Sequence, residues 1–336
     1  MKKLLYIGNN LTTHNITTTS IQTLGSFLEQ EGYVLFYASS KKNKIVRLLD
    51  MILKTIIYSK KVDYVLIDVY STLNFWYAFI ISQLCRLLGL PYITKLHGGD
   101  LPRRLQQNPW MSDLIFKNAY KTSAPSLYLL SVFEKRYAAN LVYIPNAIAL
   151  KNYPFKDRSI PFPKLFWLRS LASIYNPKMA IKVLSLLKKT YPHAELCMVG
   201  PDKDCMLLAL KDYAKQLNVS VAFTGKLSKQ DWIELSKDFN IFINTTHYDN
   251  TPVSVLEAMA LGLPVVSTNV GGMPFLLQDN VDGLLVSDND AQAMAEAIIN
   301  LVTFEYFKTA LINQARQKVE AFDWEIVKNK WLEILN

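Results

Sequence analysis

The sequence predicts an α/β chain made of two doubly wound domains, each built on a parallel sheet. Short apolar runs rich in β-branched residues alternate with segments of helical periodicity, and they do so in two successive series. A polar, proline-rich segment separates the two series. The length of 336 residues exceeds one typical hydrophobic core and suits two domains of about 150 residues.

Residues 1–150 hold the first series. We expect strands at 4–8, 33–38, 64–67, 92–96 and 142–144. Apolar residues at helical spacing predict helices near 18–30, 45–57 and 73–88. Because the strands are separated by helices, they should form a parallel sheet with ligands at its carboxyl edge.

Residues 151–163 carry Pro154, Pro161 and Pro163 among charged residues, so we expect an interdomain linker there. The second series occupies 164–322, with strands expected at 164–168, 195–199, 221–224, 241–244 and 264–268. A last amphipathic helix should follow Asp323 and reach Leu335. The second domain is thus expected to have the same layered architecture as the first.

Composition excludes several classes of protein. Half of the residues are hydrophobic, so a disordered chain is not expected. No run reaches the roughly 18 apolar residues of a membrane span, and no signal-peptide pattern follows Met1. The three cysteines are odd in number and lack metal-ligand spacing. We therefore expect a cytoplasmic protein.

The net positive charge of +9 comes entirely from the first half of the chain. Residues 1–150 contain 17 Lys/Arg and 8 Asp/Glu, whereas residues 151–336 contain 20 of each. This asymmetry predicts an anionic partner for the first domain, such as an anionic membrane surface or a lipid-linked diphosphate. No nucleic-acid-binding module is recognisable, so nucleic acid is not expected as a partner.

Residues 41–61 combine a helical apolar stripe with seven basic residues. Such a segment can lie on an anionic leaflet, which would make the protein peripheral on the inner face of the plasma membrane. In a doubly wound domain the same stripe more often packs on the sheet. We favour the core interpretation, and both hold together if the cations face lipid while the stripe faces inward.

Residues 246–268 predict an anion site at the start of a helix. Thr251 is a suitable N-cap, Pro252 suits the first helical position, and Gly262 suits the left-handed stop. The free N–H groups of Val253 and Ser254 would then face the loop that carries Asp249 and Asn250. A diphosphate is a natural occupant of this site.

Four further polar groups are candidates for the same chemistry. Glu257 lies inside the expected helix and can accept hydrogen bonds from hydroxyl groups such as those of ribose. Arg169 directly follows a predicted strand, and Lys178 follows it in sequence. Two cations of this kind can stabilise a departing diphosphate. His97 also follows a strand, beside Gly98 and Gly99, whose lack of side chains allows close approach of a ligand.

The chain resembles the family 4 retaining glycosyltransferases (glycosyl transferases group 1), which have the GT-B fold. The resemblance rests on the order and spacing of the acid-x7-acid motif, Asp249 to Glu257, and of these further segments: Leu96-His97-Gly98-Gly99-Asp100, Ile144-Pro145-Asn146, Leu168-Arg169-Ser170-Leu171, Tyr175-Asn176-Pro177-Lys178, Phe223-Thr224-Gly225, Val270-Gly271-Gly272-Met273-Pro274 and Asp282-Gly283-Leu284-Leu285-Val286. Two positions depart from the family pattern. Asp249 stands where Glu is usual, and Phe275 stands where an acid often follows the Gly-Gly-x-Pro turn.

The resemblance implies a retaining transferase that moves a sugar from a nucleoside-diphosphate sugar to a saccharide or lipid-linked acceptor in cell-surface polysaccharide or lipopolysaccharide synthesis. The first domain would bind the acceptor, with the helix at 323–336 packing back on it, and the second would bind the donor. Residues 250–254 and Glu257 would hold the nucleotide, and Asp249 the sugar hydroxyls. Arg169 and Lys178 would hold the diphosphate, with His97, Gly98 and Gly99 completing the site. No metal or other cofactor is expected.

Two alternatives remain for the function. A nucleotide-sugar epimerase can share this fold, although it needs acid/base groups that these motifs do not supply. A catalytically silent partner subunit of the same fold is the second, and Asp249 and Phe275 are the changes that would favour it. A glycosidase pair is disfavoured, because residues 252 to 257 rise about 7.5 Å along a helix, more than the roughly 5 Å between the carboxyl groups of a retaining hydrolase. Asp202-Lys203-Asp204 is expected to be solvated charge.

Overall fold

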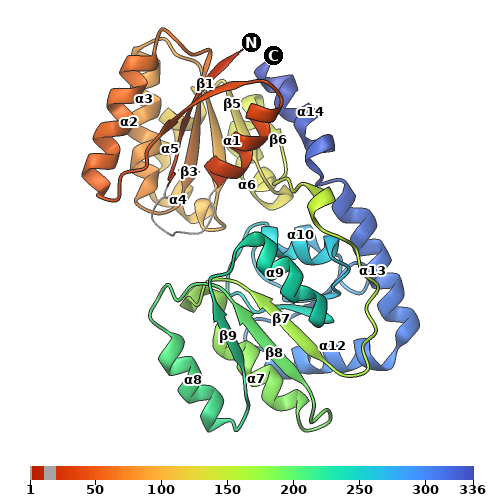
Figure 1. Ribbon diagram of the computed structural model, residues 1–336. Coiled ribbons are helices and arrows are strands. Elements are labelled where there is room, and N and C mark those ends of the chain that lie inside the picture. The colour runs from red at the N-terminus through yellow and green to blue at the C-terminus, as the bar shows by residue number, and fades with distance from the viewer. Residues whose placement is uncertain (1, 11–19) are drawn as a thin grey trace. The chain divides into compact units, whose positions relative to one another are not determined.

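The structure is a computed structural model that describes residues 2–10 and 20–336. Its chain forms two compact units (Figure 1). The first unit comprises Met1–Ala147 and Val327–Asn336, and the second comprises Ile148–Ile326. Each unit contains a six-stranded sheet in which every strand pair is parallel. The predicted fold class, two doubly wound α/β domains, is confirmed.

The sheet of the first unit has the strand order β2-β1-β3-β4-β5-β6. Its strands are β1 Lys3–Ile7, β2 Val34–Ala38, β3 Tyr64–Tyr70, β4 Tyr92–His97, β5 Lys121–Ala124 and β6 Leu141–Tyr143. The chain reverses its direction of travel across the sheet at β1, so β1 and β3 lie next to each other. The carboxyl ends of β1, β3 and β4 therefore meet at one edge, where ligands bind in doubly wound sheets.

The helices of the first unit connect these strands. They are α1 Ser20–Gln30, α2 Lys44–Tyr58, α3 Asn74–Leu87, α4 Leu101–Gln107, α5 Pro109–Phe116 and α6 Leu127–Tyr137. The first expected helix included Thr18 and Thr19, which lie outside the described residues. The last helix, α14 Trp324–Leu335, returns to this unit from Val327 onward. There Lys328 pairs with Glu31 at 3.3 Å, and Lys2 donates to the carbonyl oxygen of Leu335 at 2.6 Å.

Helix α2 packs on the unit in an unexpected orientation. Our interpretation of its apolar stripe as core is wrong for most of the stripe, because five of its seven members are exposed: Ile45, Leu49, Leu53, Ile56 and Ile57. The buried residues of α2 are Arg47, Met51 and Thr55. Arg47 is fixed there by hydrogen bonds from its guanidinium to Asn9 Oδ1 (3.0 Å) and the carbonyl of Lys41 (2.7 Å). The inward face thus combines the polar residues Arg47 and Thr55 with Met51, Leu48 and Ile52, which pack on the core.

The sheet of the second unit has the order β12-β11-β10-β7-β8-β9. Its strands are β7 Lys164–Leu168, β8 Glu195–Val199, β9 Ala222–Gly225, β10 Ile241–Asn244, β11 Val265–Thr268 and β12 Leu284–Val286. Its helices are α7 Pro177–Leu187, α8 Leu207–Gln216, α9 Lys229–Leu235, α10 Val253–Ala260, α11 Met273–Leu276, α12 Ala291–Thr303 and α13 Glu305–Glu320.

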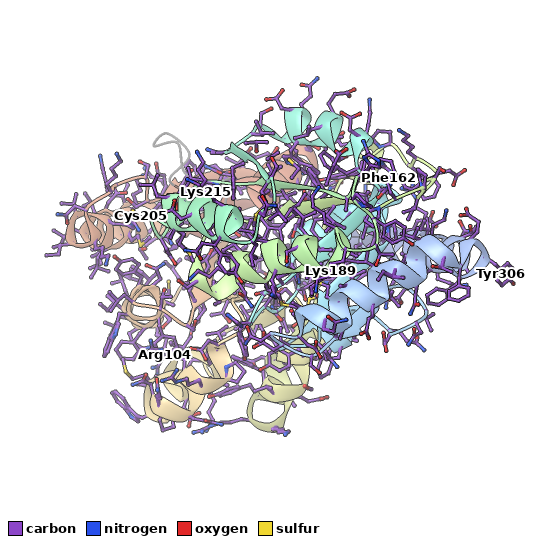
Figure 2. The ribbon with its side chains drawn as sticks, turned by 90° about the horizontal axis from the view of Figure 1, so that it is seen from below. Arg104, Phe162, Lys189, Cys205, Lys215 and Tyr306 are labelled. Atoms are coloured by element: carbon purple, nitrogen blue, oxygen red, sulfur yellow. The ribbon has the colours of Figure 1, made fainter. Side chains whose placement is uncertain are left out.

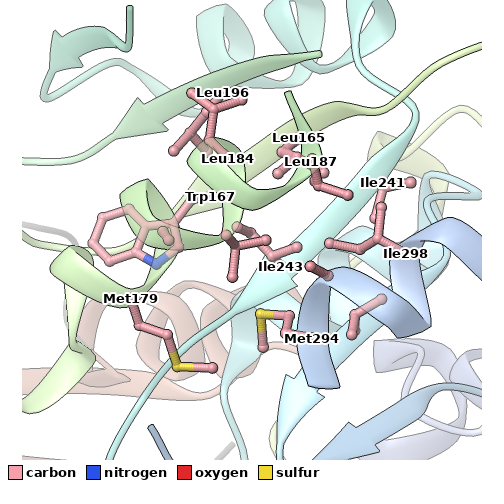
Figure 3. Packing of buried hydrophobic residues seen from close by; sticks show 14 of the residues in the cluster. Leu165, Trp167, Met179, Leu184, Leu187, Leu196, Ile241, Ile243, Met294 and Ile298 are labelled. Atoms are coloured by element: carbon pink, nitrogen blue, oxygen red, sulfur yellow. The ribbon is translucent and has the colours of Figure 1, made fainter. Parts of the chain in front are cut away.

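Alternation along the central strand β7 gives the second unit a core on each face of its sheet. Leu165 and Trp167 belong to one cluster, which packs against α7 and α12 (Figure 3). Phe166 points to the opposite face and joins a second cluster with α10 and Trp232 of α9. Both faces of a parallel sheet are buried in this way when helices cover each of them. The carboxyl edge of the sheet remains for a ligand.

The segment 151–163, which the sequence indicates as a linker, is packed into the second unit. Tyr153 is 1% exposed. Arg158 is buried, and its guanidinium donates to the carbonyl oxygens of Phe239 and Leu261, both at 2.9 Å. These bonds satisfy the two terminal nitrogens of the guanidinium and so offset the cost of burying its charge, while Nε has no partner among the described residues. Residues 151–163, called the strap below, are therefore an ordered part of the second unit.

Cys205 and Tyr306 are exposed side chains of the second unit. Cys85 and Cys197 are buried, whereas Cys205 is exposed in the loop before α8 (Figure 2). Tyr306 projects from α13 and is 89% exposed (Figure 2). Across residues 2–10 and 20–336, none of the helices combines the length and the apolar character needed to cross a membrane.

Candidate functional site

Helix α10 begins and ends close to where the sequence indicates. It starts at Val253, with Pro252 in an extended conformation (ψ 119°) as the N-cap. The prediction of Thr251 as N-cap is therefore wrong by one residue, because the extended backbone of Pro252 leaves it outside the helix. At the other end, Gly262 adopts φ +74° and Leu263 N donates to the carbonyl of Ala258 at 3.0 Å. This confirms the predicted glycine stop.

The first turn of α10 presents unsatisfied polar groups. Among the described residues, the N–H groups of Val253 and Ser254 make no hydrogen bond. The hydroxyl of Ser254 is buried and has no partner either. Free N–H groups at a helix N-terminus carry partial positive charge and bind anions. The geometry expected from the sequence is present at this turn.

Arg169 lies immediately beyond the end of β7. Its backbone N–H donates to the carbonyl of Val199 at 3.0 Å, which continues the pairing with β8. A Cβ on Gly200 would lie 1.8 Å from the carbonyl oxygen of Arg169, so only glycine allows this approach. The Arg169 guanidinium forms an ion pair with Asp249 and lies 4.8 Å from the ring centre of Tyr175. Its Nε is buried without a hydrogen-bond partner.

The loop that carries Asp249 is held by a tight glycine turn. Gly272 N donates to the carbonyl of Asp249 at 2.9 Å, and Asn250 N donates to Asp249 Oδ1 at 2.7 Å. A Cβ on Gly272 would lie 1.9 Å from the carbonyl oxygen of Asn250, which explains the need for glycine there. Asn250 and Thr251 are buried in this loop. The turn and the loop therefore position Asp249 for Arg169.

Glu257 is buried on α10 and held by two groups. Tyr153 donates to Glu257 Oε1 at 2.6 Å, and Lys229 of α9 lies 3.3 Å from the same oxygen. Burial raises the pKa of the Glu257 carboxyl, and Lys229, Tyr153 and Arg169 oppose that rise. Both contacts converge on Oε1. Within the described part of the chain no hydrogen bond reaches Oε2, which is therefore the oxygen left for a ligand hydroxyl.

Two residues of this site were missed by sequence reasoning. Tyr153 lies in the proline-rich segment taken as a linker, and Lys229 lies in the first turn of a short surface helix. The Lys229 ammonium lies 4.9 Å from the Tyr153 ring centre as well as beside Glu257. No motif marks either residue, because each reaches Glu257 only through tertiary packing.

Lys178 lies apart from this ion pair. It is exposed on the first turn of α7, and its ammonium lies 5.8 Å from the ring centre of Tyr213 on α8. Tyr175 occupies the position against the Arg169 guanidinium instead. The structure thus joins Arg169 with Asp249 but does not join Lys178 to them. A diphosphate role for Lys178 stays a prediction.

His97 ends β4 in the first unit. Its Nε2 is 2.8 Å from Asp68 Oδ1, and its ring is stacked on Tyr70 at 4.7 Å between centres. Gly98 follows with φ +79°, and Gly99 continues the turn. Burial lowers the pKa of His97, the nearby Lys95 lowers it further, and Asp68 opposes both. The histidine is thus oriented by a carboxylate at the carboxyl edge of the sheet.

Asp68 is the centre of a buried polar cluster. Besides His97, it accepts a hydrogen bond from the Tyr6 hydroxyl at 3.1 Å. Lys95 is 5% exposed, and its ammonium donates to Ser20 Oγ at 2.5 Å. Burial lowers the pKa of Lys95 to about 8, although the charge on Asp68 opposes that shift. The cluster thus groups a lysine ammonium and an imidazole around one carboxylate.

The acids of the loop before α8 have structural partners. Asp202 accepts hydrogen bonds from the N–H groups of Met206 and Leu207, and Asp204 accepts one from Ser173 N at 2.9 Å. Asp202, Lys203 and Asp204 are exposed, as expected for solvated charge, and the two carboxylates also cap backbone N–H groups. In the part of the chain that the structure describes, no three His, Cys, Asp or Glu side chains group as metal ligands would.

The fold agrees with those of known structures. Sucrose-phosphate synthase from Thermosynechococcus elongatus matches with a TM-score of 0.82 at 16% identity, over 99% of this chain and 98% of that one. HepE of Anabaena, in a structure with UDP-glucose, matches with a TM-score of 0.79 at 16% identity, over 100% and 99% of the two chains. At such low identity these likenesses concern the fold, which is GT-B.

One segment of the chain matches a family model. Residues 161–318 match the family model described as Glycosyl transferases group 1. This segment contains Arg169, Asp249 and helix α10. The chain therefore carries a group 1 glycosyltransferase domain on a GT-B fold, and the resemblance stated from the sequence is confirmed.

Curated relatives match over part of their length. The amylovoran biosynthesis glycosyltransferase AmsK of Erwinia amylovora is 41% identical over 88 residues, which are 26% of this chain and 22% of the relative. The poly(ribitol-phosphate) alpha-N-acetylglucosaminyltransferase of Staphylococcus aureus is 28% identical over 221 residues, 64% of this chain and 43% of the relative. The chain thus spans less than half the length of these two relatives.

Proposed function

We propose that the protein is a retaining glycosyltransferase. It moves a sugar from a nucleoside-diphosphate sugar to a saccharide or lipid-linked acceptor during assembly of a cell-surface polysaccharide or lipopolysaccharide. The family of residues 161–318 supports the reaction class. The names of the relatives, one for amylovoran synthesis and one acting on poly(ribitol phosphate), support the acceptor class.

One observation carries the donor assignment. Arg169 Nε and Ser254 Oγ are both buried without a hydrogen-bond partner, and the N–H groups of Val253 and Ser254 are unbonded among the described residues. Buried polar groups are rarely left unsatisfied in a folded protein, so such groups at a family motif mark a ligand site. Three of them, Arg169 Nε and the two N–H groups, are charged or positively polarised donors, and a diphosphate supplies acceptor oxygens for them.

Each of the remaining groups binds a different part of the donor. Glu257 accepts hydrogen bonds from the ribose hydroxyls through Oε2, while Tyr153 and Lys229 keep Oε1 fixed. Asp249 accepts hydrogen bonds from hydroxyls of the transferred sugar once the donor is bound. Residues 250–254 shape the nucleotide site around the α10 N-terminus. His97, Gly98 and Gly99 stay candidates for binding the donor sugar or its phosphate, and Lys178 stays a candidate for the diphosphate.

The chemical step breaks one bond and forms another on the same face of the sugar. The bond between the anomeric carbon and the diphosphate oxygen breaks, and the acceptor hydroxyl oxygen bonds to that carbon. The departing phosphate oxygen takes the hydroxyl proton. Negative charge grows on the diphosphate as it leaves, and Arg169 with the α10 N-terminus stabilises that charge more than the ground state. This chemistry needs no resident metal ion.

The proposal includes a cellular location. The excess of nine positive charges in residues 1–150 suits a cytoplasmic protein that associates peripherally with an anionic leaflet, where lipid-linked acceptors reside.

A product assay tests the proposed function. The protein is incubated with UDP-, GDP- and ADP-sugars, with and without saccharide and lipid-linked acceptors, and products are followed by NMR of the anomeric proton. We expect a new glycosidic bond with the anomeric configuration of the donor, unchanged by EDTA. An epimerised donor would indicate an epimerase. Donor binding without any product would indicate a silent subunit, and an inverted product would reject the retaining step.

A further inference from the structure

The strongest unexplained feature outside the donor site is the outward face of α2. Six large apolar side chains on this helix are between 47% and 71% exposed: Ile45, Val46, Leu49, Leu53, Ile56 and Ile57. Monomeric soluble proteins rarely expose contiguous apolar side chains of this number, and such a patch usually marks an interaction surface.

The orientation of α2 is set by the polar residues beneath it. Arg47, Met51 and Thr55 follow one another at intervals of four, so they lie on one side of the helix, and they are its buried residues. Lys54 reinforces the orientation by donating to the carbonyl of Tyr37 at 2.8 Å. The six exposed residues lie on the opposite side. The helix therefore presents six apolar side chains outward, while its inward side combines Arg47 and Thr55 with the apolar residues Leu48, Met51 and Ile52.

Basic residues flank this apolar face at both ends. Exposed lysines precede or begin the helix at 41, 42 and 44, and two more follow it at 60 and 61. The only acid between residues 41 and 61 is Asp50, which pairs with Lys54 at 3.5 Å. Thus no unpaired carboxylate accompanies the exposed apolar side chains.

The helices next to α2 carry further exposed aromatic side chains. α2 packs on α3, and α3 packs on α5 (Figure 1). Trp76 of α3 is 44% exposed and Trp110 of α5 is 68% exposed. Phe79 contacts both indole rings, at 6.4 and 6.1 Å between centres. Exposed tryptophans of this kind are typical of surfaces at the level of lipid headgroups.

We propose that α2 lies in the interface of an anionic bilayer, with its six exposed apolar side chains among the acyl chains and the flanking lysines against the headgroups. A helix of 15 residues that spans about 22 Å is long enough to lie in the plane of the interface. The proposal specifies the peripheral association included in the proposed function. It adds insertion of a defined helix face to attraction by charge.

Charge decides between a bilayer and a second copy of the chain. Two copies that met through α2 would bring together the lysines at both ends of each helix, within a half of the chain that has nine excess positive charges. An anionic leaflet is complementary to the same charges and can accept the apolar face. We therefore commit to lipid as the occupant.

The test measures sedimentation with vesicles of phosphatidylcholine alone or of phosphatidylcholine with phosphatidylglycerol. We expect the protein to bind the anionic vesicles and to bind neutral ones at least tenfold more weakly. Leu49→Gln, Leu53→Gln and Ile57→Gln together should weaken binding to anionic vesicles at least tenfold, and so should Lys41→Gln, Lys42→Gln and Lys44→Gln. The control Leu208→Gln with Tyr306→Gln, at residues 76% and 89% exposed in the second unit, should leave binding unchanged.

A probe on the helix separates insertion from surface contact. Leu53→Cys in a Cys205→Ser background carries an environment-sensitive fluorophore, since Cys85 and Cys197 are buried. Its emission should shift to the blue on anionic vesicles. No binding by the unaltered protein, or binding that the apolar triple change leaves intact, would overturn the proposal. Self-association that the same change abolishes would assign the face to a second copy. Transfer to a soluble acceptor is scored separately, so failure of the proposed function does not affect this result.

Discussion

Arg169 is the residue whose surroundings say most about the reaction. Its guanidinium is paired with Asp249, stacked on Tyr175, and retains one buried, unsatisfied N–H. The sequence predicted this residue correctly as one that follows a strand, because β7 is a plain apolar run that ends at Leu168. Its pairing with Asp249 was not predictable, since 80 residues separate the two.

We predict that Arg169→Ala lowers kcat roughly 100-fold or more and raises KM by much less. The charge that Arg169 meets grows as the diphosphate departs, so the loss falls on the transition state. Steady-state kinetics with a fixed acceptor measure both constants. Arg169→Lys keeps the charge without the planar fork and should recover part of kcat. An unchanged kcat with a raised KM would show that Arg169 serves binding alone.

His97 provides a second prediction at the residue scale. Burial keeps the pKa of His97 below its ordinary value. Lys95 lowers this pKa further, whereas Asp68 raises it. Lys95→Met should therefore raise the His97 pKa, and Asp68→Asn should lower it further. NMR titration of the His97 ring measures both shifts. Lys135→Met, an exposed lysine of α6, should leave the His97 pKa unchanged. Movement of the pKa in the same direction in both variants would contradict the cluster we describe.

The lowered pKa of His97 also determines how the stability of the fold changes with pH. The folded-state pKa of His97 lies below the unfolded value of about 6.5. As the pH falls through this range, the unfolded chain binds the proton first, so His97 makes folding less favourable on acidification. Asp68→Asn widens that difference and should steepen the loss of stability at low pH.

At the scale of elements, strands that are short apolar runs were predicted well, whereas a strand of polar residues was missed. β7, β8 and β10 were predicted with their observed bounds because each is a short apolar run. β5 was missed because its sequence, Lys121–Ala124, holds no large apolar residue. Its buried Thr122 instead pairs its hydroxyl with that of Thr94 on β4 at 2.9 Å. A hydrogen bond of this kind between side chains of two strands cannot be recognised from the hydropathy of the sequence.

For helix α2 the sequence predicted the element correctly but its buried face wrongly. Its periodicity correctly predicted a helix, but period alone does not say which face is buried. Arg47 and Lys54 decided the orientation through bonds to backbone carbonyls that the sequence does not reveal.

The turn at Gly271–Gly272 gives a prediction at the same scale. Gly272→Ala places a Cβ 1.9 Å from the carbonyl oxygen of Asn250, so the loop of Asp249 must move. We expect a loss of about 1–3 kcal/mol in unfolding free energy together with at least tenfold weaker donor binding, measured by denaturation and calorimetry.

The matched control for this prediction is Gly89→Ala. Gly89 has φ +64° and no neighbour within 4 Å of a built Cβ, so the substitution costs about 1–2 kcal/mol through backbone strain. It should leave donor binding unchanged. Normal donor affinity in Gly272→Ala would show that the turn does not position the site.

At the scale of the whole molecule, the two series of strands and helices correspond to two compact units. The boundary between them, Ala147 to Ile148, precedes the proline-rich strap that packs on the second unit. The strap supplies Tyr153 to Glu257, so a segment that looked like a linker is part of the candidate donor site. Only tertiary contacts could reveal this, because prolines and charges mark both linkers and surface straps.

The central claim is that the second unit binds a nucleoside-diphosphate sugar with Glu257 on the ribose. Isothermal titration of UDP-, GDP- and ADP-sugars into the full protein and into Glu257→Gln tests it most directly. We expect one nucleotide class to bind, and the variant to bind it about 10- to 150-fold more weakly, since a hydrogen bond with a charged member contributes about 1.5–3 kcal/mol. Lys215→Gln, on the exposed face of α8, should bind as the unaltered protein does. Equal affinity within twofold for Glu257→Gln, or no binding by any nucleotide sugar, would contradict the account.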